Sequence, residues 1–291
     1  MSNQIFQTLK ELPTPLEESQ CVLHKHKILI CGGINQRACY SYHILKNEYK
    51  FICDYPSDVI LNGHCVVKLI DNKKDRNQIT LLSFGGSYKH TLVMKYISVW
   101  SNISSKLNKS NEFNNYNQWI PFKDNHNHPI IIGRDQDDYN GVRAVIGGSN
   151  NHLLFITYYE NNISVFNLNT FQFIKDDTLP TDNWVQFHCF VSNSVDGQGQ
   201  EIMKTNKEKN KQNNKMLLFR EDTGLSIEYD ENNNIFQFHL LPVCDDIAQF
   251  YSYAYVCIND IVLFFGGWDG TFDNTVISKS VHKYSIRENN G

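Results

Sequence analysis

The sequence predicts an all-β protein in which a four-stranded unit recurs about five times. The first observation is that a short apolar run ending in a turn occurs five times along 291 residues. Runs of four to eight residues bounded by turn signals are typical of buried strands. The five runs are KILICGG (27–33), ITLLSFGG (79–86), HLLFITYYENN (152–162), KMLLFREDTG (215–224) and DIVLFFGG (260–267).

The second observation is that another apolar segment precedes each run, as a first strand would. These segments are CVL (21–23), GHCVVKLI (63–70), GVRAVI (141–146), WVQFHCFVS (184–192) and YAYVCI (253–258). Three runs end in a glycine pair, which lets one strand turn into the next. No Lys followed by Ser or Thr comes after these glycines, so a phosphate-binding loop is not expected. The pairs are Gly32 and Gly33, Gly85 and Gly86, and Gly266 and Gly267.

The third observation is a pair of aromatic residues seven positions apart, which we assign to the third and fourth strands of a unit. The pairs are Tyr42 with Tyr49, Phe166 with Phe173, and Tyr229 with Phe236. A proline follows each pair and is expected to end the fourth strand. These prolines are Pro56, Pro180 and Pro242.

The last unit is predicted to lack its fourth strand. Tyr284 is its third-strand aromatic, and the position seven residues on is Gly291. At the other end of the chain, Phe6 precedes Pro13 by seven residues, as a fourth-strand aromatic would. We therefore expect residues 4–13 to complete the last unit and to close the units into a ring.

The units resemble kelch repeats, and the resemblance covers essentially the whole chain. It rests on the apolar strand, the glycine pair, the third-strand aromatic and the fourth-strand aromatic; the third and fourth units lack the glycines. The kelch family implies a β-propeller in which each repeat is one four-stranded blade. Independently, units this small must stack to bury their sheet faces. We expect one domain, 1–291, with units at 20–57, 63–122, 141–180, 184–242 and 252–291.

The composition favours an intracellular, monomeric protein. A formal net charge of −4 argues against a nucleic-acid or anionic-membrane surface. The N-terminus lacks the pattern of a signal peptide, and no apolar stretch is long enough to span a membrane. The eight cysteines contain no C-x-x-C pair and are expected to be buried thiols in the cytoplasm. No cofactor is expected.

An up-and-down blade has two edges, and the sequence distinguishes them. Three biased insertions, 71–78, 101–118 and 194–214, fall on the edge of the one-two and three-four turns. The two-three turns and the links between units form the other edge, which is rich in aromatic and charged residues suited to protein recognition. Its candidate partner-binding residues are Arg37, Tyr88, Lys89, His90, Tyr158, Tyr159, Arg220, Trp268 and Asp269.

The long link 123–141 lies on this second edge and contains two candidate metal ligands, His126 and His128. The sequence fixes no Cys, Asp or Glu beside them to complete a tetrahedral site, so no metal is expected. His64 and His188 each precede a cysteine in a first strand. Because that dipeptide recurs, we interpret it as structural and not as a Cys–His catalytic pair.

The first functional hypothesis is a non-enzymatic scaffold or adaptor that binds a protein or peptide partner on the edge of the two-three turns and links. The alternative is an enzyme or carbohydrate-binding propeller that uses the axial pocket and the 123–141 loop. A third hypothesis is that the chain is a fragment of a larger kelch protein. The sequence contains no catalytic constellation that favours the enzyme.

Overall fold

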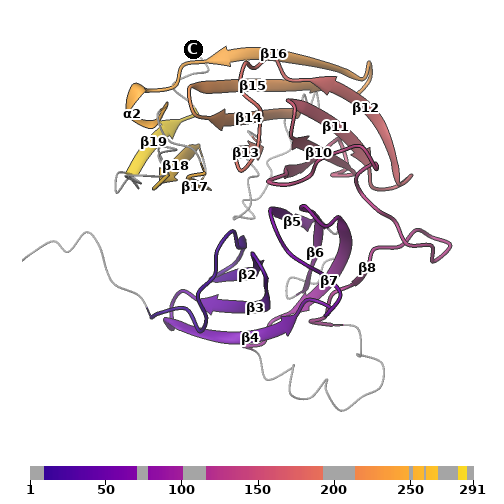
Figure 1. Ribbon diagram of the computed structural model, residues 1–291, viewed down its shortest axis with the longest axis vertical. Helices are drawn as coiled ribbons and strands as arrows, with labels where there is room; N and C mark the ends of the chain where they lie inside the picture. The colour runs from indigo at the N-terminus through magenta and orange to yellow at the C-terminus, as the bar shows by residue number, and fades with distance from the viewer. Residues whose placement is uncertain are drawn as a thin grey trace, which may run out of the picture.

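The protein is a five-bladed, all-β propeller in a computed structural model (Figure 1). The structure describes residues 10–70, 78–100, 116–192, 214–248, 252–258, 260–267 and 281–286. A single short helix in these ranges, α2 (Asp245–Ala248), follows the fourth blade. Within the same ranges, no helix is both long and apolar enough to cross a bilayer.

The first two blades are antiparallel sheets whose strands pair in chain order. Four strands make each sheet. The first blade contains β1 (Gln20–His24), β2 (Lys27–Gly33), β3 (Gln36–His43) and β4 (Glu48–Asp54). The second contains β5 (His64–Leu69), β6 (Gln78–Gly85), β7 (His90–Ile97) and the short β8 (Ile120–Pro121).

The third and fourth blades repeat this order, and the fifth shows three strands in the described residues. The third contains β9 (Arg143–Gly147), β10 (Leu153–Tyr158), β11 (Asn162–Asn167) and β12 (Gln172–Thr178). The fourth contains β13 (Cys189–Ser192), β14 (Asn214–Arg220), β15 (Thr223–Asp230) and β16 (Ile235–Leu241). The fifth contains β17 (Ala254–Ile258), β18 (Ile261–Phe265) and β19 (Val281–Ser285).

The first strands face the middle of the ring, and the fourth strands lie outside. Figure 1 shows β5, β13 and β17 towards the middle and β4, β12 and β16 at the periphery. Successive first strands pack side by side, β1 on β5, β5 on β9, β9 on β13 and β13 on β17. The predicted insertions lie mostly outside the described residues. The strands that precede them, β5, β7 and β13, end on one edge of the ring, and Gln78 and Asn214 belong to strands.

The register confirms all three predicted aromatic pairs. Tyr42 lies opposite Tyr49 with ring centroids 4.7 Å apart. The Phe166–Phe173 pair is 5.1 Å apart and the Tyr229–Phe236 pair 4.8 Å apart. Cross-strand aromatic pairs of this kind fix the register of a hairpin. The prolines expected to end the fourth strands come one or two residues after β4, β12 and β16.

Most of the prediction for the closing strand falls on residues outside the described ranges, including Phe6. The described part of that segment, residues 10–13, is not in a strand. The backbone N–H of Lys10 donates to Asn47 Oδ1 of the first blade at 3.1 Å. Tyr284 packs against Phe219 of the fourth blade, with 4.7 Å between ring centroids.

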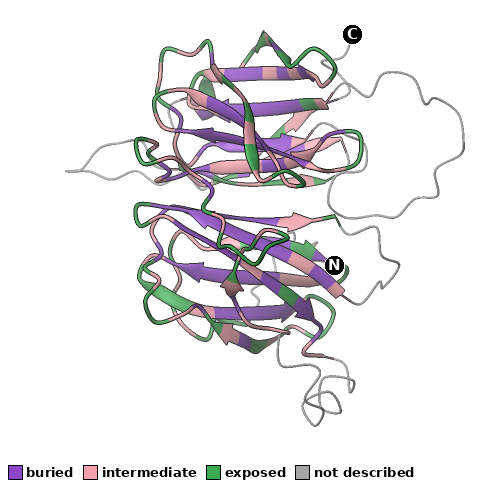
Figure 2. Ribbon diagram, turned by 90° about the vertical axis from the view of Figure 1, so that its right-hand side faces the viewer, coloured by how far each residue is buried: buried purple, intermediate pink, exposed green. Residues whose placement is uncertain are grey.

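The hydrophobic core lies between neighbouring blades, and buried residues run along the strands that enclose it (Figure 2). Four clusters of buried side chains fill the junctions from the first blade to the fifth. At the first junction, Tyr55 stacks on Trp119 of the second blade with 4.6 Å between ring centroids. Each sheet therefore buries its faces against its neighbours, as the small size of the unit requires.

A repeated left-handed residue brings the chain to the axis before each first strand. Positive φ occurs at Glu18, Gly63, Gly141, Phe187 and Ser252, each one or two residues before its strand. Their backbones connect successive blades: Gly141 N–H donates to Gly63 C=O, and Phe187 N–H donates to Gly141 C=O, both at 2.9 Å. A Cβ at Gly141 would lie 2.7 Å from the Phe187 ring, so this approach requires glycine.

At the first junction, a side chain takes the place of the carbonyl in this series. Gly63 N–H donates to Glu18 Oε2 at 2.9 Å. Burial raises the pKa of the Glu18 carboxyl, and the hydrogen bond from Gly63 opposes that shift. We refer to these contacts among Glu18, Gly63, Gly141 and Phe187 as the inner ring.

The loss of glycine pairs in the third and fourth units has a local explanation. In the third unit Tyr158 pairs with Asn162, and the left-handed residues are Glu160 and Asn161 within the turn. In the fourth unit Arg220 pairs with Thr223 across a two-residue turn, where Glu221 is left-handed. In the third unit, Tyr158 and Tyr159 occupy the positions of the glycine pair, and the positive φ angles lie beyond them in the turn. In the fourth unit, a tight hairpin turn contains the residue with positive φ.

Removal of one member of an aromatic pair should destabilise the propeller. Phe166→Ala deletes a ring that is 2% exposed and contacts Phe173, so we expect the free energy of unfolding to fall by about 3–5 kcal/mol. The control Phe51→Ala removes a ring that is 53% exposed on the outer strand β4, and it should cost less than about 1 kcal/mol. Urea unfolding measures both, and equal losses would contradict the assignment of Phe166 to a core between blades.

Candidate functional site

The two-three turns and the links between blades lie on one edge, which we call the link edge. The links are residues 55–63, 122–142, 179–188 and 242–253. Among the predicted partner-binding residues, Tyr88 is 58% exposed. Arg37 is also exposed. Its Nη1 donates to Tyr55 C=O at 3.2 Å, which holds the guanidinium against the first link. Trp268 and Asp269 lie outside the described residues.

The structure buries two residues that the sequence placed on this edge. His90 is the first residue of β7, and its Nε2 lies 2.8 Å from Ser83 Oγ, which accepts a hydrogen bond from the Tyr55 hydroxyl at 3.0 Å. Tyr158 is the last residue of β10, and its hydroxyl lies 3.0 Å from Ser164 Oγ. His90 and Tyr158 are therefore core residues and are not available to a partner.

Lys89 anchors the long 123–141 link instead of projecting freely from its turn. Its ammonium donates to the carbonyls of Arg134 and Asp135, the latter at 2.9 Å. The Arg134 guanidinium in turn binds both carboxylate oxygens of Asp176, at 2.8 and 2.7 Å, and lies 4.3 Å from the Phe173 ring centroid. Both hydrogen bonds come from Nη2, and charge-assisted bonds of this kind hold the link against the third blade.

The two histidines of the same link both interact with the carboxylate of Asp124. Asp124 Oδ1 accepts the backbone N–H groups of His126 and His128, at 2.7 and 2.9 Å. His128 Nδ1 lies 3.2 Å from Asp124 Oδ2. Across the described ranges, the His, Cys, Asp and Glu side chains form no group of three with the spacing of a metal site. Asp124 acts here as a turn-capping residue.

Trp184 is an exposed aromatic residue of the link edge that sequence reasoning missed. It was assigned to a first strand at 184–192, but β13 begins only at Cys189, so Trp184 belongs to the preceding link. Its side chain is 57% exposed and contacts Tyr159 edge-on, with 4.9 Å between centroids. The signal that could have found it is its place four residues after Pro180, the proline that ends the fourth strand.

Arg143 is the second residue that sequence reasoning missed. It begins β9 next to the inner ring, and its guanidinium lies 5.7 Å from the ring centroid of Phe187. Its Nη1 donates to the C=O of Val142 at 2.9 Å. The signal was a single charged residue inside the apolar segment GVRAVI.

The recurring histidines join blades, which supports the structural interpretation. His64 Nε2 lies 3.2 Å from Cys31 C=O in the first blade, and His188 Nε2 lies 2.6 Å from Thr157 Oγ1 in the third. Each contact runs from the start of a first strand, or the residue just before it, to the second strand of the preceding blade. Burial lowers the pKa of His64 to about 3, with further lowering by His90 and Arg143.

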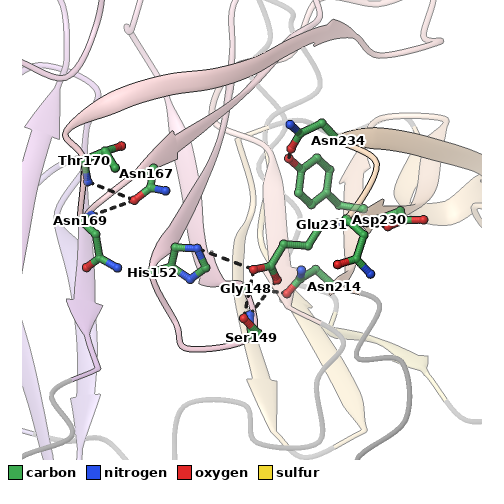
Figure 3. Close-up of polar contacts among 12 residues, drawn as sticks. Gly148, Ser149, His152, Asn167, Asn169, Thr170, Asn214, Asp230, Glu231 and Asn234 are labelled. Atoms are coloured by element: carbon green, nitrogen blue, oxygen red, sulfur yellow. Dashed lines mark hydrogen bonds and ion pairs between the residues drawn. The ribbon is translucent and has the colours of Figure 1, made fainter.

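The opposite edge carries an unrelated polar cluster (Figure 3). Glu231 accepts the backbone N–H of Ser149 at 2.8 Å and its hydroxyl at 3.0 Å, and lies 3.6 Å from His152 Nε2. Gly148 N–H donates to Asn214 Oδ1 at 2.7 Å. The serine hydroxyl is bound to the carboxylate and not to the histidine, so this cluster lacks the order of a catalytic triad and joins the third blade to the fourth.

The fold defines the class of protein, a five-bladed β-propeller. Among solved structures the chain is similar to YjhT, a kelch-like propeller, with a TM-score of 0.59 and 13% identity over 95% of this chain and 83% of that one. It is also similar to a protein of unknown function from Bacteroides thetaiotaomicron VPI-5482, with a TM-score of 0.50 and 10% identity over 95% of this chain and 57% of that one. No protein-family model matches the chain, and no curated protein matches it by sequence.

The buried histidines predict acid sensitivity. His64 has a pKa of 6.5 when unfolded and about 3 when folded, so the unfolded chain binds the proton more readily and stability is lost as the pH falls below 6.5. His64→Gln keeps an N–H donor for Cys31 but does not titrate. We expect its free energy of unfolding to depend less steeply on pH between 7.5 and 4.5 than that of the wild type.

Urea unfolding at several pH values measures this dependence. The control His26→Gln alters an exposed histidine and should leave the slope unchanged. An unaltered slope in His64→Gln would show that His64 does not contribute to acid unfolding.

Proposed function

We propose that the protein is a non-enzymatic interaction module that binds a protein or peptide partner on the link edge. The observation that carries the proposal is the aromatic pair formed by the exposed Trp184 and the half-buried Tyr159, in edge-on contact where the third blade meets the fourth. Tryptophan and tyrosine dominate the energetics of protein interfaces. A tryptophan left more than half exposed by the fold offers most of its apolar surface to a partner.

The assignment to the kelch repeat is part of this proposal. It is supported by the glycine pairs of three units and by the confirmed aromatic pairs between third and fourth strands. Kelch propellers commonly serve as scaffolds and adaptors, and the link edge has the rigid support that such a role needs. Lys89 and Arg134 hold the long link on the second and third blades. A partner therefore binds without the entropic cost of ordering this link.

The exposed residues of the link edge suggest the chemistry of the partner. Tyr88 and Ile131 are 58% and 64% exposed, and Arg37 lies on the same edge. An apolar centre with a polar rim is the usual anatomy of a transient interface. We therefore propose a peptide segment with at least one large apolar side chain, which would contact Trp184.

A displayed random-peptide library tests the proposal. Peptides selected on the wild-type protein are resynthesised with a fluorophore, and their affinity is measured by fluorescence polarisation. Trp184→Ala should weaken them by about 2 kcal/mol, or roughly thirtyfold, because it removes a candidate hot-spot residue. Phe51→Ala is the matched control, since it deletes an exposed ring from the outer strand β4 and should leave affinity unchanged.

Two outcomes would contradict the proposal. One is that selection yields no peptide that binds the wild type. The other is that Trp184→Ala and Phe51→Ala bind the selected peptides equally well, which would place the interface away from the link edge.

A further inference from the structure

Arg143 lies close to the propeller axis. Its strand, β9, packs on β5 on one side and β13 on the other. Its positive charge acts on titratable groups in all four other blades: Glu18 before β1, His64 in β5, His188 before β13 and Tyr255 in β17. The inner ring fixes this position, because Gly141, two residues before Arg143, is hydrogen-bonded to Gly63 and to Phe187 of the neighbouring blades.

The guanidinium of Arg143 is poorly neutralised by the protein. An arginine has five N–H donors. The side chain donates one hydrogen bond, from Nη1 to Val142 C=O, and otherwise contacts the Phe187 ring. In the described part of the chain, no carboxylate lies within ion-pair distance of it. A partly buried cation without a counter-ion is unfavourable, so this position attracts an anion.

Arg220 provides a second cation at the same end of the axis. It ends β14 directly after Phe219, which pairs with Cys189, so Arg220 lies next to His188 in the register of the two strands. His188 in turn contacts Thr157, the residue that pairs with Arg143. Both arginines lower the pKa of His188. Arg220 Nε forms an ion pair with Glu221 Oε1 at 3.1 Å, but neither Nε nor the buried Nη1 has a hydrogen-bond partner. His188 is 1% exposed, and its Nδ1 is also without a partner.

The charge balance selects the class of anion. Glu221 already neutralises Arg220, so Arg143 leaves an excess of one positive charge, because Glu18 accepts from Gly63 and lies beyond ion-pair distance of Arg143. One carboxylate matches this excess, while a phosphate dianion would exceed it. Arginine binds carboxylates through two parallel N–H donors, and the free donors of Arg143 allow that geometry.

We propose that Arg143, with Arg220 beside it, forms a carboxylate-binding site at the link-edge end of the propeller axis. The carboxylate belongs either to a free organic acid or to an acidic side chain of a peptide. The inference goes beyond the proposed function, because a free acid would bind here without any partner protein and without Trp184.

Titration calorimetry on the full chain tests the site with four compounds. These are succinate, its neutral diamide, a capped tetrapeptide with one glutamate and the same peptide with glutamine. We expect succinate or the glutamate peptide to bind and the neutral compounds not to bind. Binding of succinate assigns a free acid, and binding of the glutamate peptide alone assigns a peptide side chain.

Arg143→Gln should weaken the bound compound by about tenfold or more, since it removes charge-assisted hydrogen bonds. Arg143→Lys should retain part of the affinity. The control Lys50→Gln removes an exposed positive charge from the outer strand β4 and should leave affinity unchanged. In the wild type, the Arg143 Nε–H signal in a ¹⁵N-edited NMR spectrum should shift on addition of the compound, which provides a readout that does not depend on the variants folding.

Three outcomes would overturn the proposal. The first is that neither carboxylate binds, or that the Arg143 signal does not move. The second is equal affinity in wild type and Arg143→Gln. The third is tighter binding of inorganic phosphate than of either carboxylate. Each outcome is separate from the peptide-library test, because that test depends on Trp184 and this one on Arg143.

Discussion

The inner ring is the contact on which the rest of the structure depends. Its hydrogen bonds from Gly63 N–H to Glu18, Gly141 N–H to Gly63 and Phe187 N–H to Gly141 bring the start of each first strand to the axis. Left-handed φ at each place turns the chain from a link into a strand. Once the first strands are fixed side by side, the remaining strands of a blade follow by hairpin pairing, and the apolar faces meet between blades.

The same constraint creates the electrostatic character of the axis. Because all first strands begin near one point, a single charged residue at such a position interacts with groups from every blade, as Arg143 does. The nearby histidines respond by remaining neutral: burial and neighbouring cations depress the pKa of His64 and His188. The link edge further out is different, since its turns are held by Lys89 and Arg134 and expose Tyr88 and Trp184.

The sequence predicted the parts of this fold that depend on short stretches of chain. Tyr229 and Phe236 lie opposite each other because four turn residues connect their strands, so spacing alone reveals the pair. Accessibility could not be read in this way. His90 and Tyr158 are the terminal residues of β7 and β10, one position from the turns to which they were assigned, and contacts across the fold bury them. Trp184 and Arg143 were missed for a similar reason, since exposure and position relative to the axis arise only when blades assemble.

The junction between the first two blades differs from its neighbours in heredity as well as in chemistry. At the later junctions, the acceptors are main-chain carbonyls, which every codon supplies. At the first junction the acceptor is the Glu18 carboxylate, so a single missense change at one codon can remove it. Variation among descendants of this gene should therefore be more restricted at residue 18 than is usual for an acidic residue in a turn, and a lineage that loses Glu18 would need a compensating acceptor for Gly63.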